Sequence, residues 1–172
     1  MEVVLIQGHS NTGKTTLCKK IAKYLVIADF KEVIRENVNN PDKDFRAIYV
    51  HKQCKTRVII NSGSDLITLV REFDKLYKQN KKNDILITAI RIPNTIIYKH
   101  DVHKGIKDIY KNDFVEEHII DLDVEKKKNE DLDFCEFIDK ILKDHGCKIL
   151  EKIKNKLNCK IEIDCTPMIK KC

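Results

Sequence analysis

The residues most suggestive of chemistry lie near the start of the chain, in the segment 8–15, which reads GHSNTGKT. Gly8 and Gly13, followed at once by Lys14 and Thr15, fit the pattern G-x-x-x-x-G-K-[ST] of a phosphate-binding loop. The backbone N–H groups of such a loop surround an anion, and the N-terminus of the following helix adds a partial positive charge. The pattern therefore predicts a site for a chain of phosphates. The simpler alternative is a glycine-rich turn that precedes a helix.

Each residue type in this loop has an expected part in binding. The two glycines, Gly8 and Gly13, permit backbone angles and close approaches that a Cβ would obstruct. We expect Lys14 to reach the β- and γ-phosphates and the Thr15 hydroxyl to ligate Mg²⁺. The other candidate nucleotide contacts of the loop are His9, Ser10, Asn11, Thr12 and Thr16, the last of which also supports the first helical turn.

The segments on both sides of the loop predict a strand before it and a helix after it. Residues 3–6 are an unbroken run of apolar, mostly β-branched side chains, as expected for a strand buried on both faces of a parallel sheet. After the loop, apolar side chains recur at helical spacing at Leu17, Cys18, Ile21, Ala22 and Leu25. This order is the structural context that the loop pattern requires.

Further along the chain, apolar runs alternate with helical patterns. The predicted strands are 47–50 and 57–60, which form a hairpin, then 85–90, 118–122 and a last edge strand at 160–163. The predicted helices are 66–77, a short helix around 106–110, and a helix from Phe134 that breaks or ends near Gly146, with helical spacing continuing from Ile149 to Leu157. Residues 30–34 extend the first helix or form a second short one, and 37–44 are expected to be a loop.

Strands that alternate with helices predict a single domain, residues 1–172, of the α/β class, with a doubly wound, mostly parallel sheet and helices on both faces. Ligands of such sheets bind at the carboxyl ends of the strands. Asp65 and Arg91 follow two predicted strands, so we expect Asp65 to help hold Mg²⁺ and Arg91 to face the terminal phosphate. The alternatives are that Asp65, or its neighbour Ser64, caps a helix, and that Arg91 is solvated or pairs with Asp65.

The composition is typical of a globular chain, with 42% hydrophobic and 35% charged residues among 172. The net charge of +6 comes from lysines spread along the whole sequence. The chain has no Trp, and its basic runs have no neighbouring aromatic residues, so direct binding of nucleic acid is not favoured. The apolar runs are too short to span a membrane, and we expect no membrane partner.

The cysteines and the first residues both bear on where the protein resides. Seven cysteines, an odd number without a C-x-x-C pair, predict reduced thiols rather than disulfides or zinc ligands. The first predicted strand begins directly after Glu2, which leaves no room for a signal peptide. We therefore expect a cytoplasmic protein.

Taken together, the phosphate loop, Asp65 and Arg91 resemble the P-loop NTPase superfamily, and within it the small kinase-like members. A more specific resemblance is carried by residues 57–65 (RVIINSGSD) and 85–91 (ILITAIR). They are similar to small, often phage-associated ATP-binding proteins in which one strand ends in a Ser/Gly/Asp loop and a later strand ends in Ala-x-Arg. The resemblance covers residues 1–95 and implies the P-loop NTPase fold. The sequence departs from the superfamily in three features: it has no clear hydrophobic run that ends in Asp, no Asn-Lys-x-Asp motif and no arginine-rich lid.

Two classes of function follow from these residues. The first is a kinase-like phosphotransferase that uses ATP and Mg²⁺, in which Lys14 and Arg91 stabilise the migrating phosphoryl group and Asp65 helps hold the metal. Its acceptor would be a small molecule or nucleotide held by residues 92–115. The second class, favoured by the missing lid, is a nucleotide-binding or slow ATPase module that signals its bound state to a protein partner. A third, a nucleic-acid-associated ATPase, is supported only by the positive charge.

Overall fold

The computed structural model describes residues 1–38, 44–63, 66–80, 82–92, 100–113 and 116–157. Over these ranges the chain is an α/β protein with a six-stranded sheet in the order β2-β3-β4-β5-β1-β6. The strands are β1 (Glu2–Gly8), β2 (Phe30–Val38), β3 (Asp44–His51), β4 (Arg57–Asn61), β5 (Ile85–Arg91) and β6 (Glu116–Asp121). The helices are α1 (Lys14–Ile27), α2 (Ile67–Gln79), α3 (His100–Tyr110), α4 (Leu122–Lys128) and α5 (Phe134–Lys156).

The sheet is mixed in direction. Strands β4, β5, β1 and β6 run parallel to one another, whereas β3 pairs antiparallel with both β2 and β4. The α/β class is therefore confirmed, and so is the hairpin, which consists of β3 and β4. The sheet is less parallel than we predicted, because β3 runs opposite to the other strands and makes both pairings at that end of the sheet antiparallel.

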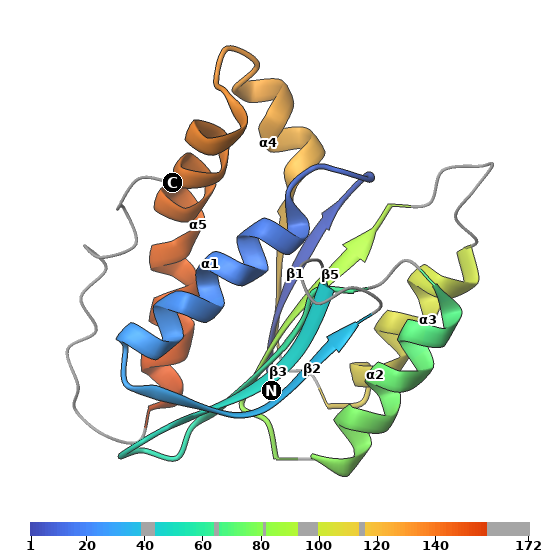
Figure 1. Ribbon diagram of the computed structural model, residues 1–172, viewed down its shortest axis with the longest axis vertical. Helices are drawn as coiled ribbons and strands as arrows, with labels where there is room; N and C mark the ends of the chain where they lie inside the picture. Colours follow the sequence, from blue (N-terminus) through green and yellow to red (C-terminus); the bar gives the residue numbers. More distant parts are fainter. Residues whose placement is uncertain (39–43, 64–65, 81, 93–99, 114–115, 158–172) are drawn as a thin grey trace.

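Helices lie on both faces of the sheet, as Figure 1 shows. Helices α1 and α5 bury one apolar cluster against one face, which includes Val4 and Ile6 of β1. Helices α2 and α3 bury a second cluster against the opposite face, which includes Val3 and Leu5. Successive side chains of a strand point to opposite faces, so the unbroken apolar run of β1 is explained by burial on both sides.

The helix expected over residues 30–34 is wrong, because these residues form β2. Helix α1 ends at Ile27, and Asp29 adopts a positive φ of 63° that turns the chain back toward the sheet. Strand β2 then pairs with β3 along its length, with a bulge between Glu32 and Ile34. These residues form a strand because they pair with a later segment of the chain, and the local pattern of apolar residues cannot predict such a pairing.

The break expected at Gly146 is also wrong, because α5 runs without interruption from Phe134 to Lys156. A glycine inside a helix costs about 1 kcal/mol relative to alanine. Here the cost is offset by packing, since the helix buries Ile141 before Gly146 and Ile149 after it. The edge strand expected at 160–163 lies outside the described residues.

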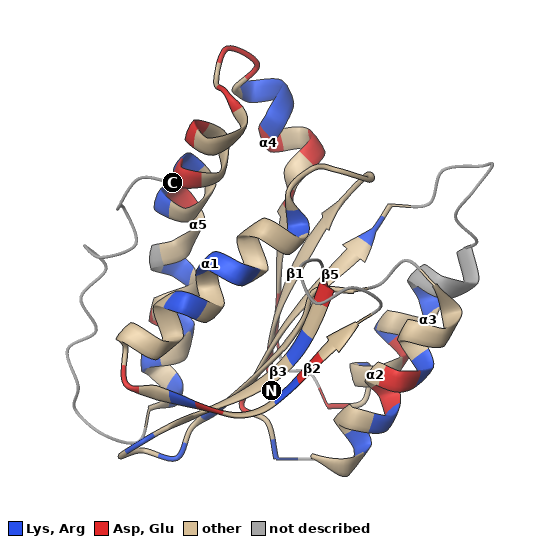
Figure 2. Ribbon diagram, in the orientation of Figure 1, with Lys and Arg blue, Asp and Glu red and all other residues tan. Residues whose placement is uncertain are grey.

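Helices α2 and α5 carry both basic and acidic residues, whereas α4 has its acidic residues in the first turn and its three lysines in the last (Figure 2). Cys18 is a buried, reduced thiol, but Cys54 is disulfide-bonded, so the prediction of reduced thiols is wrong for Cys54. Among the residues that the structure describes, no helix is both long enough and apolar enough to cross a membrane.

Candidate functional site

The segment from Gly8 to Thr15 forms a tight loop between the end of β1 and the start of α1. Two residues in it take left-handed backbone angles, with φ of 61° at Asn11 and 98° at Gly13. The Thr12 hydroxyl donates a hydrogen bond of 3.0 Å to the carbonyl of His9 and so closes the turn. A Cβ on Gly13 would lie 2.5 Å from Cδ1 of Ile138, so this position requires glycine both for its φ and for space.

Lys14 folds back over this loop. Its ammonium donates a hydrogen bond of 2.9 Å to the carbonyl of Gly8 and a second one to the carbonyl of His9. The residue is only 8% exposed. A buried ammonium needs such partners, and they fix one positive charge at the centre of the loop.

A cavity of about 550 Å³ opens above the loop. Its size falls in the range of small-molecule sites. Three cationic side chains line it, from Lys14, Lys19 and Arg91, together with the carboxylate of Asp44. The other lining residues are Ser10, Asn11, Thr12, Gly13, Thr15, Thr16, Ser62 and Phe134. The positive excess, next to the N-terminus of α1, suits an anionic ligand.

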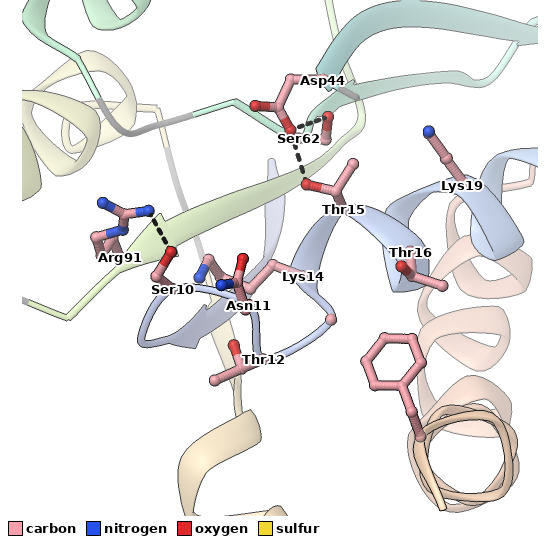
Figure 3. Close-up of a pocket in the computed structure, with 12 residues that line it drawn as sticks. Ser10, Asn11, Thr12, Lys14, Thr15, Thr16, Lys19, Asp44, Ser62 and Arg91 are labelled. Atoms are coloured by element: carbon pink, nitrogen blue, oxygen red, sulfur yellow. Dashed lines mark hydrogen bonds between the residues drawn. The ribbon is translucent and has the colours of Figure 1, made fainter. Parts of the chain in front are cut away.

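Three side-chain oxygens meet at one edge of this cavity (Figure 3). The Thr15 hydroxyl donates a hydrogen bond of 2.7 Å to Oδ1 of Asp44, and the Ser62 hydroxyl lies 3.4 Å from the same oxygen. Ser62 is itself held in place because its Oγ accepts a hydrogen bond of 2.8 Å from the backbone N–H of Phe45. The acid beside Thr15 is therefore Asp44.

Asp44 was not predicted from the sequence, because the rule that ligands bind at the carboxyl ends of parallel strands selects only residues that follow a strand. Strand β3 is antiparallel to β4, so its first residue lies at the same edge as the last residues of β4. Asp44 is that first residue, whereas we expected it to end a loop. Asp65 and Ser64 lie outside the described residues, and the metal role of Asp65 stays a prediction. Helix α2 has Leu66 at its N-cap, without a side-chain hydrogen bond.

Arg91 lies next to the loop. It is the last residue of β5 and is opposite Gly8 in the parallel pairing of β5 with β1. Its guanidinium donates a hydrogen bond of 3.0 Å to the Ser10 hydroxyl (Figure 3). The structure thus brings Arg91 together with Lys14 and Thr15 around one cavity.

A second set of contacts ties the start of the loop to the end of β6 and the first turn of α4. The Gln7 amide donates a hydrogen bond of 2.7 Å to Asp121, which also caps α4 by accepting from two backbone N–H groups. One carboxylate oxygen of Asp123 lies 2.9 Å from the backbone nitrogen of His9 and 2.8 Å from its Nδ1. These acids hold the loop in position, and no sequence pattern indicated them.

Behind the loop, the thiol of Cys18 is chemically inert. Burial, together with the nearby carboxylate of Asp44, raises the pKa of Cys18 to about 12. Only the thiolate is a nucleophile, so Cys18 packs as an apolar side chain.

A smaller cavity of about 360 Å³ adjoins the first and shares Thr16 and Lys19 with it. It lies between α1 and the strands β2 and β3, and Lys23 and Arg35 are among its basic lining residues. Near its floor, Glu32 accepts hydrogen bonds of 2.6 Å from the Tyr49 hydroxyl and 2.8 Å from Arg35. Burial, with the hydrogen bond to Glu32, raises the pKa of Tyr49, which keeps this hydroxyl protonated. This second cavity is thus a groove beside the first one whose charged side chains are mostly basic, although most of its lining surface is apolar.

Comparison with known proteins finds no matching family model and no matching curated protein. Among solved structures, the chain is similar to the crystal structure of APE1195, with a TM-score of 0.38 and 11% sequence identity. That match covers 94% of this chain and 78% of the other. A similarity at this level supports no conclusion about fold family or function, so the interpretation of the site depends on its own geometry.

Proposed function

We propose that this chain is a kinase-like P-loop phosphotransferase that binds ATP and Mg²⁺ at the Gly8–Thr15 loop. The observation that carries the proposal is the contact of Thr15 with Asp44, within one cavity that Lys14 and Arg91 also line. A hydroxyl, a carboxylate and two cations around a glycine-bearing loop are the groups that phosphoryl transfer needs. The parallel strands β4, β5, β1 and β6, with the loop following β1, support a P-loop NTPase fold.

The side chains at the edge of the cavity fit Mg²⁺. This ion prefers oxygen ligands, keeps several waters, and is commonly held by one or two carboxylates together with substrate phosphates. Thr15 and Asp44 offer a hydroxyl and a carboxylate in direct contact, and Ser62 adds a second hydroxyl. When bound, the metal would neutralise negative charge on the phosphates.

The two cations that line the cavity would act on the phosphates themselves. Lys14 would exchange its contacts with the loop carbonyls for contacts with the β- and γ-phosphates. Arg91 would offer its planar fork of N–H donors to the oxygens of the γ-phosphate. An acceptor oxygen would attack the γ-phosphorus, the bond to the β–γ bridging oxygen would break, ADP would leave with the electron pair, and the acceptor proton would pass to water.

The adjoining groove supports transfer to an acceptor over a module that only binds nucleotide. It meets the first cavity at Thr16 and Lys19, so a molecule held there would lie next to the bound triphosphate. Lys19 and Lys23 line this groove and favour an anionic small molecule or nucleotide, whereas Arg35 is already paired with Glu32. Residues 92–115, which the sequence predicts as the acceptor site, lie partly outside the described residues.

Isothermal titration calorimetry with ATP, GTP, CTP and UTP, with and without Mg²⁺, tests the binding half of the proposal. Transfer is then followed by ³¹P NMR with a panel of nucleoside monophosphates and with water as acceptor. Lys14→Ala should abolish turnover, while Lys127→Ala, an exposed lysine on α4, should match the wild type. Tight triphosphate binding without transfer to any acceptor would favour the signalling module, and wild-type turnover in Lys14→Ala would contradict both.

A further inference from the structure

Phe134 is an exposed aromatic residue in an otherwise largely polar cavity. It is 50% exposed and lines the cavity above the Gly8–Thr15 loop. The sequence pattern placed it on the apolar stripe of its helix, but the stripe that is buried consists of Phe137, Ile138, Ile141 and Leu142. A half-exposed aromatic ring in the wall of a polar cavity offers an apolar contact surface to a ligand that enters this cavity.

The ring is held in a defined place. Phe134 is the first residue of α5, whose start is fixed by a capping box in which Asp133 and Glu136 each bond the backbone of the other. The ring lies against Gly13, since a Cβ on that glycine would be 3.2 Å from Cε2 and 3.3 Å from Cζ of Phe134. The aromatic surface is therefore positioned directly beside the phosphate loop.

The Phe134 ring and the Arg91 guanidinium lie at different ends of the loop. Arg91 contacts Ser10, and Figure 3 shows this pair on one side, with Thr16 and Lys19 on the other. Phe134 lies against Gly13, close to the start of α1. A triphosphate with its terminal phosphate toward Arg91 would therefore direct its nucleoside toward the end of the cavity that Phe134 lines.

We propose that Phe134 is the platform on which the base of the bound nucleotide stacks, and that it favours purine nucleoside triphosphates. This inference rests on the proposed function. Bases stack on aromatic rings through their π-faces, and removing such a ring weakens binding by about 5- to 100-fold. A purine offers two fused rings to the platform, whereas a pyrimidine offers one, so the purine gains more.

The test compares ligands that do and do not carry a base. Calorimetry in the presence of Mg²⁺ measures the affinities of ATP, CTP and inorganic tripolyphosphate for the wild type, Phe134→Ala, Phe134→Leu and Phe134→Trp. Ile27→Ala is the matched control, because Ile27 is 63% exposed but is the last residue of α1, at the end of the helix opposite the phosphate loop. Thermal melting monitored by circular dichroism checks that each variant is folded.

Phe134→Ala and Phe134→Leu should lose about 5- to 100-fold in ATP affinity and less than about twofold in tripolyphosphate affinity. Phe134→Trp should retain ATP affinity, and the preference for ATP over CTP should shrink in the alanine variant. Equal losses for ATP and tripolyphosphate would instead assign Phe134 to shaping the loop against Gly13. Unchanged ATP affinity in Phe134→Ala would overturn the inference while leaving the proposed function standing. No binding of ATP or tripolyphosphate by the wild type would overturn both.

Discussion

Replacing Asp44 by asparagine is the sharpest test of the metal site. The change keeps the size of the side chain and its ability to accept the hydrogen bond from Thr15, which measures 2.7 Å in the protein. It removes the negative charge next to the Thr15 hydroxyl. The stability of the fold should therefore change little, whereas the affinity of the site for Mg²⁺ should fall.

The expected magnitude follows from the contacts at this edge of the cavity. Exchanging a carboxylate for an amide removes one charge-assisted interaction, worth about 1.5 to 3 kcal/mol. That corresponds to about 10- to 100-fold in the affinity for ATP in the presence of Mg²⁺. Without Mg²⁺ the sign reverses, because Asp44 repels the triphosphate, so the variant should bind free ATP at least as tightly as the wild type.

Calorimetric titration of ATP at several Mg²⁺ concentrations measures both effects. Asp108→Asn, on α3 and in contact with Lys111 at the surface, is a control with the same change of charge. Asp65→Asn tests the carboxylate that the sequence predicted for the same role. If Asp44→Asn shows the Mg²⁺ dependence of the wild type and Asp65→Asn loses it, the assignment of Asp44 is refuted. If neither change matters, the Mg²⁺ site itself is refuted.

Three further changes test the other parts of the site and the fold. Lys14→Met keeps the side-chain stem but removes the ammonium that bonds the loop carbonyls, so ATP affinity should fall at least about tenfold by calorimetry; equal affinity would contradict its role. Arg91→Lys should lower kcat by about 100-fold with little change in nucleotide affinity, because a lysine lacks the rigid fork of donors; parallel losses in steady-state rate and affinity would make Arg91 a binding residue. Burial and the neighbouring ring of His145 lower the pKa of His118, so the unfolded chain binds more protons and stability should fall as the pH drops below about 6.5. Urea unfolding at several pH values should show a smaller loss for His118→Asn, and an unchanged pH dependence would rule out this pair as the cause.

The parts of the structure that the sequence predicted are those decided by neighbouring residues. The strand before Gly8 and the helix from Lys14 follow from local patterns, and the strand that ends at Arg91 follows from its unbroken apolar run. The two predicted strands are found in the structure as β1 and β5, which lie side by side in the sheet and have buried apolar side chains. The position of the loop between β1 and α1 is fixed by these elements.

The parts that sequence reasoning missed depend on pairing between distant segments. Residues 30–34 form a strand because β3 lies beside them, and the local pattern of apolar residues is compatible with a helix as well. Phe134 has the spacing of a core residue, yet at the first position of α5 it stays half exposed beside the phosphate loop, whereas Ile138, one turn later, is buried. A periodic pattern defines a face of a helix, but it does not say where that face ends.

The same reasoning explains why the candidate metal carboxylate precedes its strand. In a sheet with one antiparallel strand, the edge that holds the carboxyl ends of the parallel strands also holds the amino end of the antiparallel one. Strand β3 is such a strand, and Asp44 at its start lies against Thr15 from α1 and Ser62 after β4. The site is thus assembled from several different elements, since Arg91 comes from β5 and the loop is tied to Asp121, the last residue of β6, and to Asp123 of α4. Because each element carries a different contact, changes at Asp44, Arg91 and Phe134 should separate metal dependence, rate and base preference from one another.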